Sequence, residues 1–131
     1  MLNNKSVAIF GHTGMVGKTT FNWFKNQGYK DVMGWSRSNQ TNTIEEINEK
    51  ADYIFVCVPT PYLWKEKTVD LNSLIETLAK IRRGKIVIHK CTVPPGTTED
   101  LQEKFPGLKL IYNPEFLSEK TAEIDFANPD R

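Results

Sequence analysis

The sequence has almost no excess of charge of either sign. Its 131 residues include 17 Lys and Arg against 16 Asp and Glu, which gives a formal net charge of +1. Binding nucleic acid or an acidic membrane through charge needs a marked excess of Lys and Arg, so neither partner is expected. No apolar run approaches the length of a membrane span, and the first five residues lack the apolar core of a signal peptide. We therefore expect a cytoplasmic protein.

Cysteine is also scarce. The two cysteines, Cys57 and Cys91, show none of the spacings that hold a metal ion, so no metal site is expected. Each belongs to an apolar run that is typical of a buried strand. We therefore expect both to be small core side chains in a reducing compartment.

The most informative stretch of the chain is residues 7–17, VAIFGHTGMVG. An apolar, β-branched run leads into three glycines and then at once into a helical pattern, which predicts a strand, a tight turn and a helix. The start of such a helix binds phosphate, because its unpaired backbone N–H groups coincide with the positive end of the helix dipole. We expect Gly11 to let the chain turn, Gly14 to let the backbone approach a pyrophosphate, and Gly17 to let helix pack on strand.

Three interpretations of this stretch are open. The spacing G-x-x-G-x-x-G differs from the G-x-G-x-x-G fingerprint of dinucleotide-binding folds, so alone it is a weak signal. Gly17-Lys18-Thr19 looks like the end of a P-loop of nucleoside triphosphatases, but that motif needs a glycine at the position of His12. A glycine turn without a ligand is the third interpretation. The pattern favours dinucleotide binding over the other two.

Strand and helix patterns alternate along the rest of the chain. Strands are predicted at residues 5–10, 31–35, 52–58, 85–90 and 108–112. Helices are predicted at residues 14–27 and 43–50, from 71 to a stop at Gly84, from Thr97, and from Asn113. This alternation indicates an α/β fold, a Rossmann-like doubly wound parallel sheet with strand order 2-1-3-4-5. We expect residues 1–131 to form a single dinucleotide-binding domain.

Finer expectations concern helix caps and burial. Thr43 and Glu46 have the spacing of a capping box, and Asp70 and Thr97 are expected to cap the helices that follow them. The strand at 52–58 is expected to be buried on both faces, as parallel strands are. Residues 62–69 are predicted to be a loop.

Ligands of such sheets lie at the carboxyl ends of the strands. At those places the sequence resembles the N-terminal domain of the nucleotide-sugar 6-dehydrogenases, the UDP-glucose/GDP-mannose dehydrogenase family. The matching segments stand in the family's order and are VAIFGHTGMVG (7–17), VCVPTP (56–61), VDL (69–71), KCTVPPGTT (90–98), NPEFL (113–117) and NPDR (128–131). The later segments are specific, and together the matches span nearly the whole chain.

The resemblance implies an enzyme that oxidises the C6 alcohol of a UDP- or GDP-sugar to a carboxylate with NAD, through an aldehyde and a cysteine-bound thioester. The cofactor-binding residues that it implies are Gly11, Thr13, Gly14, Met15, Val16, Ser36, Arg37, Pro59, Thr60, Thr92 and Glu119. The catalytic residues that it implies are Thr92, which holds a water, and the acids Glu115 and Glu119. The residues implied to face the sugar nucleotide are Glu115, Phe116, Leu117 and Ser118.

The two acids also have an interpretation of their own. Glu115 and Glu119 are four residues apart, so on a helix they share one face. A site that raises the pKa of one of them would provide a general acid or base. Two solvated acids near a helix N-terminus are the alternative, which the spacing alone favours and the surrounding motif does not.

Two departures from the family concern cofactor and nucleophile. Ser36 stands where the family usually has an aspartate that binds the adenosine ribose, and Arg37 follows it. Loss of the acid removes repulsion against a 2′-phosphate, and arginine pairs with phosphate, which favours NADP over NAD. A surface arginine in a polar loop is the alternative. Cys91 replaces a serine, and without an adjacent base we expect a packed thiol and no nucleophile.

Further departures concern the sugar side and the loops. Ser118 and Lys120 replace an arginine and a glycine of the family. Residues 38–51 are shorter than the family's segment, as if one strand and one helix were deleted. His12, on the glycine turn, is expected to be within reach of phosphate, whereas His89 is expected to be a strand residue.

The family continues beyond the position of Arg131 into a further strand, a long helix and a sugar-binding domain with the catalytic cysteine. We therefore expect the NAD(P)-binding half of a nucleotide-sugar dehydrogenase, inactive alone. Its expected partners are a nucleotide sugar, a missing or separately encoded C-terminal domain, and a second copy in a homo-oligomer. A stand-alone dinucleotide-binding or regulatory remnant is the alternative, and a P-loop phosphotransferase is remote.

Overall fold

The structure, a computed structural model, describes residues 4–114. Along the chain the elements are β1 (Ser6–Phe10), α1 (Met15–Asn26), β2 (Asp31–Trp35), α2 (Ile44–Lys50), β3 (Tyr53–Val56), β4 (Tyr62–Leu63), β5 (Thr68–Val69), α3 (Asn72–Ala79), β6 (Ile86–His89), α4 (Thr97–Lys104) and β7 (Lys109–Tyr112). All five strands of the predicted sheet are present. None of these helices is long and apolar enough to cross a membrane.

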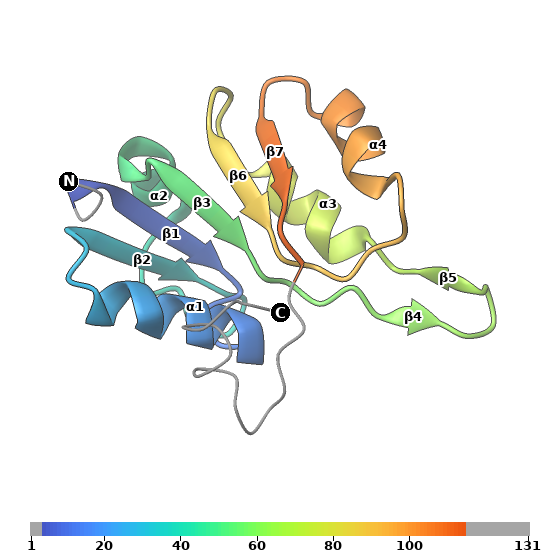
Figure 1. Cartoon of the computed structure of the whole chain (residues 1–131), viewed down its shortest axis with the longest axis horizontal. Coiled ribbons are helices and arrows are strands. Elements are labelled where there is room, and N and C mark those ends of the chain that lie inside the picture. The colour runs from blue at the N-terminus through green and yellow to red at the C-terminus, as the bar shows by residue number, and fades with distance from the viewer. Residues whose placement is uncertain (1–3, 115–131) are drawn as a thin grey trace.

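The main sheet confirms the predicted topology. Its five strands are parallel and lie in the order β2-β1-β3-β6-β7, which is the order 2-1-3-4-5 once the short strands β4 and β5 are set aside (Figure 1). The register pairs Phe10 with Trp35 on one side and with Val56 on the other, and Val56 pairs with His89. The carboxyl ends of four strands therefore meet at one edge of the sheet, next to the glycine turn.

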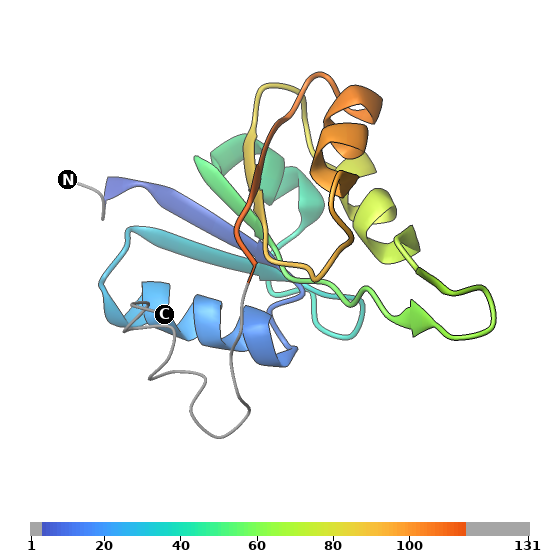
Figure 2. The same cartoon turned by 45° about the vertical axis from the view of Figure 1, so that its right-hand side comes forward.

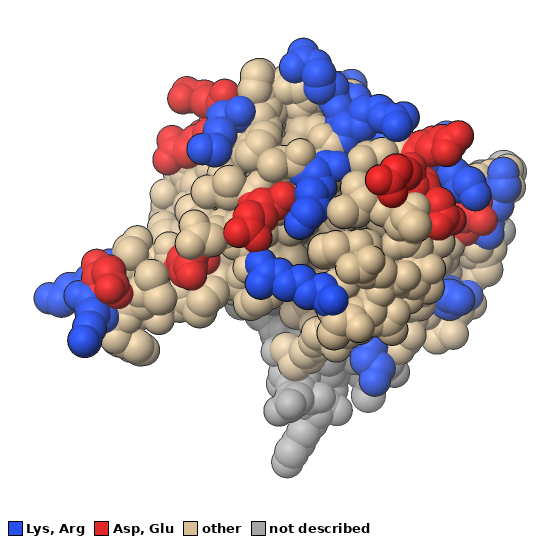
Figure 3. Space-filling view, turned by 180° about the vertical axis from the view of Figure 1, so that it is seen from behind, with Lys and Arg blue, Asp and Glu red and all other residues tan. Residues whose placement is uncertain are grey.

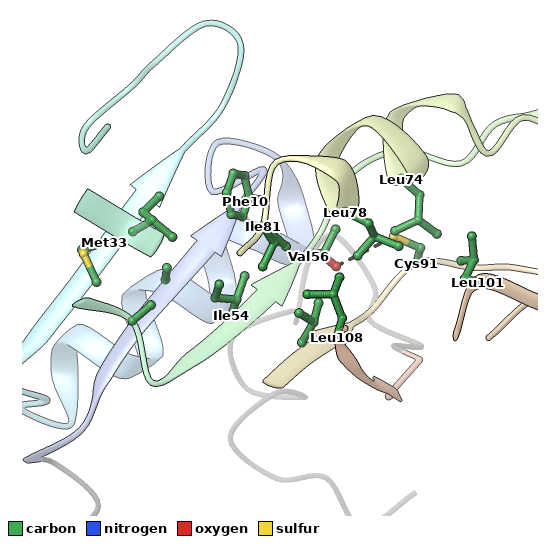
Figure 4. Packing of buried hydrophobic residues seen from close by; sticks show 14 residues of the cluster. Phe10, Met33, Ile54, Val56, Leu74, Leu78, Ile81, Cys91, Leu101 and Leu108 are labelled. Atoms are coloured by element: carbon green, nitrogen blue, oxygen red, sulfur yellow. Dashed lines mark hydrogen bonds between the residues drawn. The ribbon is translucent and has the colours of Figure 1, made fainter. Parts of the chain in front are cut away.

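Helices cover both faces of the sheet, as the doubly wound arrangement requires. Helix α1 packs on one face, and α2, α3 and α4 lie on the other (Figure 2). The larger core cluster, on the three-helix face, joins Ile54 and Val56 of β3 to Leu74 and Leu78 of α3, and Leu101 of α4 packs at its end (Figure 4). The three-helix face therefore holds most of the apolar core.

The smaller cluster explains a correction to strand β3. Ile54 and Val56 are fully buried, but Tyr53 and Phe55 point to the α1 face and are only half-buried. Within residues 4–114, α1 is the only helix on this face, and it contributes Phe24 to the cluster without covering all five strands. The prediction of burial on both faces is therefore wrong for β3, whereas the neighbouring strand β1 is buried along its whole length.

Residues 62–69 were predicted to be a loop, but they contain the antiparallel pair β4 and β5 (Figure 1). Tyr62 pairs with Val69, and the turn between the strands places Lys67 at a φ of 52°. Trp64 is 82% exposed and its ring lies 4.7 Å from that of Tyr62. The turn contains no glycine and each strand has two residues, so the sequence carries no hairpin signal.

Of the three predicted helix caps, one is confirmed and two are displaced by one residue. Thr43 accepts a hydrogen bond from the Glu46 N–H at 3.1 Å, and the Glu46 carboxylate accepts one from the Thr43 N–H, so the capping box is present. Asp70 lies one residue before the N-cap of α3, where its carboxylate accepts from the Asn72 N–H. The N-cap of α4 is Gly96, at a φ of 87°, so Thr97 is the first helical residue.

Candidate functional site

The turn between β1 and α1 depends on two glycines that have no room for a side chain. Gly11 has a φ of 85°, and a Cβ on it would overlap the carbonyl oxygen of Cys57. A Cβ on Gly17 would overlap the Gly11 carbonyl oxygen, so Gly17 lets α1 pack on the turn itself. The prediction of a tight strand–turn–helix unit is confirmed.

Gly14 differs from these two glycines, because the space in front of it is open. Only the Gly11 carbonyl oxygen, at 3.7 Å, lies within 4 Å of a Cβ built on Gly14. Helix α1 begins at the next residue, so the N–H groups of Met15 and Val16 have no partner within the helix. An open space beside a helix start fits a pyrophosphate, which would accept from these N–H groups near the positive end of the helix dipole.

The geometry of α1 does not suit a P-loop. In that motif the hydroxyl after the lysine binds the nucleotide's metal ion. The corresponding hydroxyl, on Thr19, donates a hydrogen bond to the Met15 carbonyl at 2.9 Å, and Thr19 is buried. This hydroxyl belongs to the inner face of the helix, so the triphosphatase interpretation has no support.

His12 does not face the phosphate position, so that prediction is wrong. Its Nε2 lies 3.0 Å from the Thr41 hydroxyl oxygen, its ring packs 5.3 Å from that of Phe21, and its side chain fills the space that a Cβ on Gly34 would need. Burial lowers the pKa of His12, against the smaller effect of the Trp35 backbone. The side chain braces the glycine turn against the loop after β2.

A cavity of about 300 Å³ opens on the α3 side of the glycine turn, and we call it the ribose pocket. Its lining residues are Gly11, Thr13, Gly14, Trp35, Ser36, Arg37, Ser38, Cys57, Val58, Pro59, Ser73, Glu76, Thr77 and Lys80. Ser36 and Arg37, two of the predicted cofactor-binding residues, are in this lining together with Gly11 and Gly14 of the glycine turn. The lining residues from α3 were not predicted, although their polar side chains recur at helical spacing beside the apolar ones.

A second cavity, of about 510 Å³, lies on the other side of Gly14, and we call it the proline pocket. Its lining residues are Gly14, Met15, Val16, Cys57, Val58, Pro59, Thr60, Pro61, Lys90, Cys91 and Thr92. Thr60 donates a hydrogen bond to the Thr92 carbonyl at 2.7 Å, which ties the end of β3 to the end of β6. The two pockets share Gly14, Cys57, Val58 and Pro59.

The two cysteines behave differently. Cys91 is buried, and its thiol donates to the Val58 carbonyl at 3.3 Å and toward the Val56 carbonyl at 3.8 Å (Figure 4). Burial raises the pKa of the Cys91 thiol to about 11, against the smaller opposing effect of the Val58 backbone. Cys91 is therefore a packed thiol, as predicted. Cys57 is only half-buried and lines both pockets, so its prediction as a core residue is wrong.

The carboxyl end of β7 leads to the predicted active-site acids. The Lys90 ammonium donates a hydrogen bond to the Asn113 side-chain carbonyl at 3.3 Å, which holds the chain at that point beside the proline pocket. The structure describes the chain only to residue 114. The predicted residues Glu115, Phe116, Leu117, Ser118, Glu119 and Lys120, the matching segment at 128–131 and the last helix lie outside the described residues. Among residues 4–114 no cluster of His, Cys, Asp or Glu is arranged to hold a metal ion.

The strand order and the glycine turn define a fold of the Rossmann type. A reductive aminase from Aspergillus terreus, solved with NADPH, superposes on 90% of this chain and 44% of its own with a TM-score of 0.69, at 16% sequence identity. This likeness concerns the fold.

The chain belongs to the family described as "UDP-glucose/GDP-mannose dehydrogenase family, NAD binding domain", which it matches over residues 26–131. It is 34% identical over 103 residues to a UDP-glucose 6-dehydrogenase of Campylobacter jejuni, covering 76% of this chain and 26% of that protein. It is 40% identical over 70 residues to a UDP-N-acetyl-D-mannosamine dehydrogenase of Methanocaldococcus jannaschii, covering 49% of this chain and 16% of that protein. The chain thus spans about a quarter or less of these relatives. The predicted family is confirmed.

Proposed function

We propose that residues 1–131 form one domain that binds a nicotinamide dinucleotide within a nucleotide-sugar 6-dehydrogenase. The observation that carries the proposal is the meeting of two pockets at Gly14, beside the open start of α1. A dinucleotide has the same layout, since two nucleoside halves flank a pyrophosphate. The adenosine half would occupy the ribose pocket and the nicotinamide half the proline pocket.

Each residue group has one task in this proposal. The turn residues Gly11, Thr13, Gly14, Met15 and Val16 bind the pyrophosphate, largely through backbone N–H groups. Ser36 and Arg37 surround the adenosine ribose, and Pro59 and Thr60 line the nicotinamide. Thr60 is held in place by its hydrogen bond to the Thr92 carbonyl. The bound nicotinamide supplies a hydride acceptor, and the protein residues orient it.

The substrate would be a UDP- or GDP-sugar whose C6 alcohol becomes a carboxylate. Thr92 lies at the rim of the proline pocket with its side chain exposed, where it is available to hold a water. Glu115 and Glu119 are proposed as acids of the same site, with Phe116, Leu117 and Ser118 against the sugar nucleotide. The family membership supports this assignment. Nothing in the described residues favours the stand-alone regulatory remnant.

We further propose that the cofactor is NADP rather than NAD. The loop after β2 offers Ser36 instead of an acid, and Arg37 and Lys80 both line the ribose pocket. A 2′-phosphate adds two negative charges there, and a guanidinium binds it with two parallel hydrogen bonds.

Replacing Gly14 by valine tests the proposal. The variant is expected to fold, because a Cβ on Gly14 makes only an ordinary contact of 3.7 Å with the Gly11 carbonyl oxygen. It is expected to lose affinity for either cofactor by a factor of about 100 or more, because the side chain occupies the pyrophosphate position. Calorimetric titration with NAD and NADP measures this loss. Asn26→Val, at the other end of α1, is the matched control. Unchanged binding by a folded Gly14→Val protein would contradict the proposal.

A further inference from the structure

Helix α3 presents a polar face to the ribose pocket. Ser73, Glu76, Thr77 and Lys80 line the pocket at helical spacing, while Leu74 and Leu78 point into the core. Glu76 is the only acid among the described residues of the pocket lining, and it faces two cations, Arg37 and Lys80. Lys80 lies over the Trp35 ring, with its Nζ 4.9 Å from the ring centroid.

Glu76 already has a partner in the pocket. Its Oε2 accepts a hydrogen bond from Nη2 of Arg37 at 2.9 Å, which joins α3 to the loop after β2. Both side chains are more than half exposed, at 73% for Arg37 and 56% for Glu76. Ion pairs as exposed as this contribute little to stability, so this pair can open when a stronger partner for Arg37 arrives.

Ser36 is not in a position to replace Glu76 as an acceptor. The Asn39 N–H donates to the Ser36 hydroxyl oxygen at 3.0 Å, and that hydroxyl donates to the Asn39 carbonyl at 3.2 Å. Ser36 is buried, so its hydroxyl is committed to the loop. The acidic side chain of the ribose pocket is therefore supplied by α3 and not by the end of β2.

We propose that Glu76 is a specificity-determining residue that weakens the preference for NADP by competing with the 2′-phosphate for Arg37. The proposal rests on the proposed function, since it concerns the same pocket. NADP must take Arg37 from Glu76 before the guanidinium can bind the 2′-phosphate. NAD has no 2′-phosphate and leaves the pair closed. Removing the charge of Glu76 leaves Arg37 available to the phosphate.

The test is a calorimetric titration of the 131-residue protein with NADP and with NAD, in wild type and in Glu76→Gln. The glutamine keeps the size of the side chain and removes its charge. We expect the NADP affinity to rise about fivefold relative to the NAD affinity, which corresponds to an exposed ion pair that no longer has to be broken. Glu103→Gln, on the exposed side of α4, is the control for net charge and should leave the ratio unchanged.

A second pair of variants separates competition for Arg37 from simple repulsion. In an Arg37→Gln background the effect of Glu76→Gln should disappear, because no guanidinium is left to compete for. The proposal is overturned if the NADP-to-NAD ratio is unchanged in Glu76→Gln, or if the change persists in full without Arg37. If the wild type binds neither cofactor, the proposed function fails and this inference fails with it. If it binds both and only the ratio is unresponsive, the inference alone fails.

Discussion

The two pockets that meet at Gly14 are lined by different kinds of side chain. The ribose pocket carries charged side chains from two separate elements, Arg37 from the loop after β2 and Glu76 and Lys80 from α3. The proline pocket is lined by prolines, hydroxyls and the helix start, and Lys90 is the only charged side chain among its described lining residues. We propose that the first distinguishes NADP from NAD by charge. The second is suited to holding a flat ring, and it contains no activated nucleophile among the described residues.

In our proposal, cofactor selection and covalent chemistry depend on different groups. Cofactor selection is assigned to the charged side chains of the ribose pocket. Covalent chemistry needs an ionised nucleophile, and the only thiol at the end of β6, Cys91, has a pKa raised to about 11. We propose that the described residues bind the cofactor and that residues outside them supply the nucleophile.

The largest expected effect is the absence of turnover. We expect the 131-residue protein to bind cofactor but to oxidise no nucleotide sugar, because none of residues 4–114 at the site is an activated nucleophile and residues that act as a unit fail together. The measurement is the absorbance of reduced nicotinamide during incubation with UDP-glucose, UDP-N-acetyl sugars or GDP-mannose and either cofactor. Sustained turnover that Cys91→Ala abolishes would show that the proline pocket contains its own nucleophile.

A smaller effect is expected from Ser36→Asp, which adds an acid to the ribose pocket. A carboxylate at this position repels a 2′-phosphate and accepts from ribose hydroxyls, so the NADP-to-NAD affinity ratio should fall about tenfold. Titration of wild type and variant with both cofactors measures the ratio. Ser36→Asn, of equal size and without charge, is the control. An unchanged ratio in a folded Ser36→Asp protein, or a wild type that prefers NAD, would show that charge at the end of β2 does not select the cofactor.

The smallest effect concerns the histidines behind the two pockets. His12 braces the loop of the ribose pocket, and His89 donates to or accepts from the Thr98 hydroxyl at 3.0 Å behind the proline pocket. Burial lowers the pKa of both histidines in the folded protein. Below the ordinary histidine pKa of about 6.5, the unfolded chain therefore binds more protons than the folded protein does. Stability is complete above that pH and is lost as the pH falls toward the lowered folded values.

Urea unfolding between pH 7.5 and 5.5 measures this loss, above the range where carboxylates titrate. The slope is at most about 1.4 kcal/mol per pH unit for each histidine, and it should be shallower in His89→Gln because His89 is the more deeply buried of the two. A stability that is flat over this range, or rises toward pH 5.5, would mean that neither ring is held neutral by the fold.

The sequence was sufficient for features that depend on neighbouring residues. The strand–turn–helix unit around Gly11 and the capping box of Thr43 follow from local spacing, and both are confirmed. The parallel sheet follows from the alternation of patterns, since crossovers in such sheets have one hand. The family's motif placed Thr60 and Thr92 at one edge of the sheet, and their hydrogen bond is present.

Features that join distant segments were not predictable in this way. The burial of His12 depends on the missing side chain of Gly34, on a different strand. The ion pair between Arg37 and Glu76 joins residues 39 positions apart, and only the fold brings α3 within reach of the loop after β2. Charges of both signs are interspersed over the surface shown in Figure 3, so composition alone does not indicate which of them meet.

We propose that one dinucleotide spans both pockets across Gly14. A ¹H–¹⁵N NMR titration of the 131-residue protein with NADP tests this directly. We expect the backbone signals of Gly14, of Arg37 in the ribose pocket and of Thr60 in the proline pocket to shift together with one dissociation constant, while those of the β4–β5 hairpin stay in place. Shifts confined to one pocket, or none at Gly14, would contradict it.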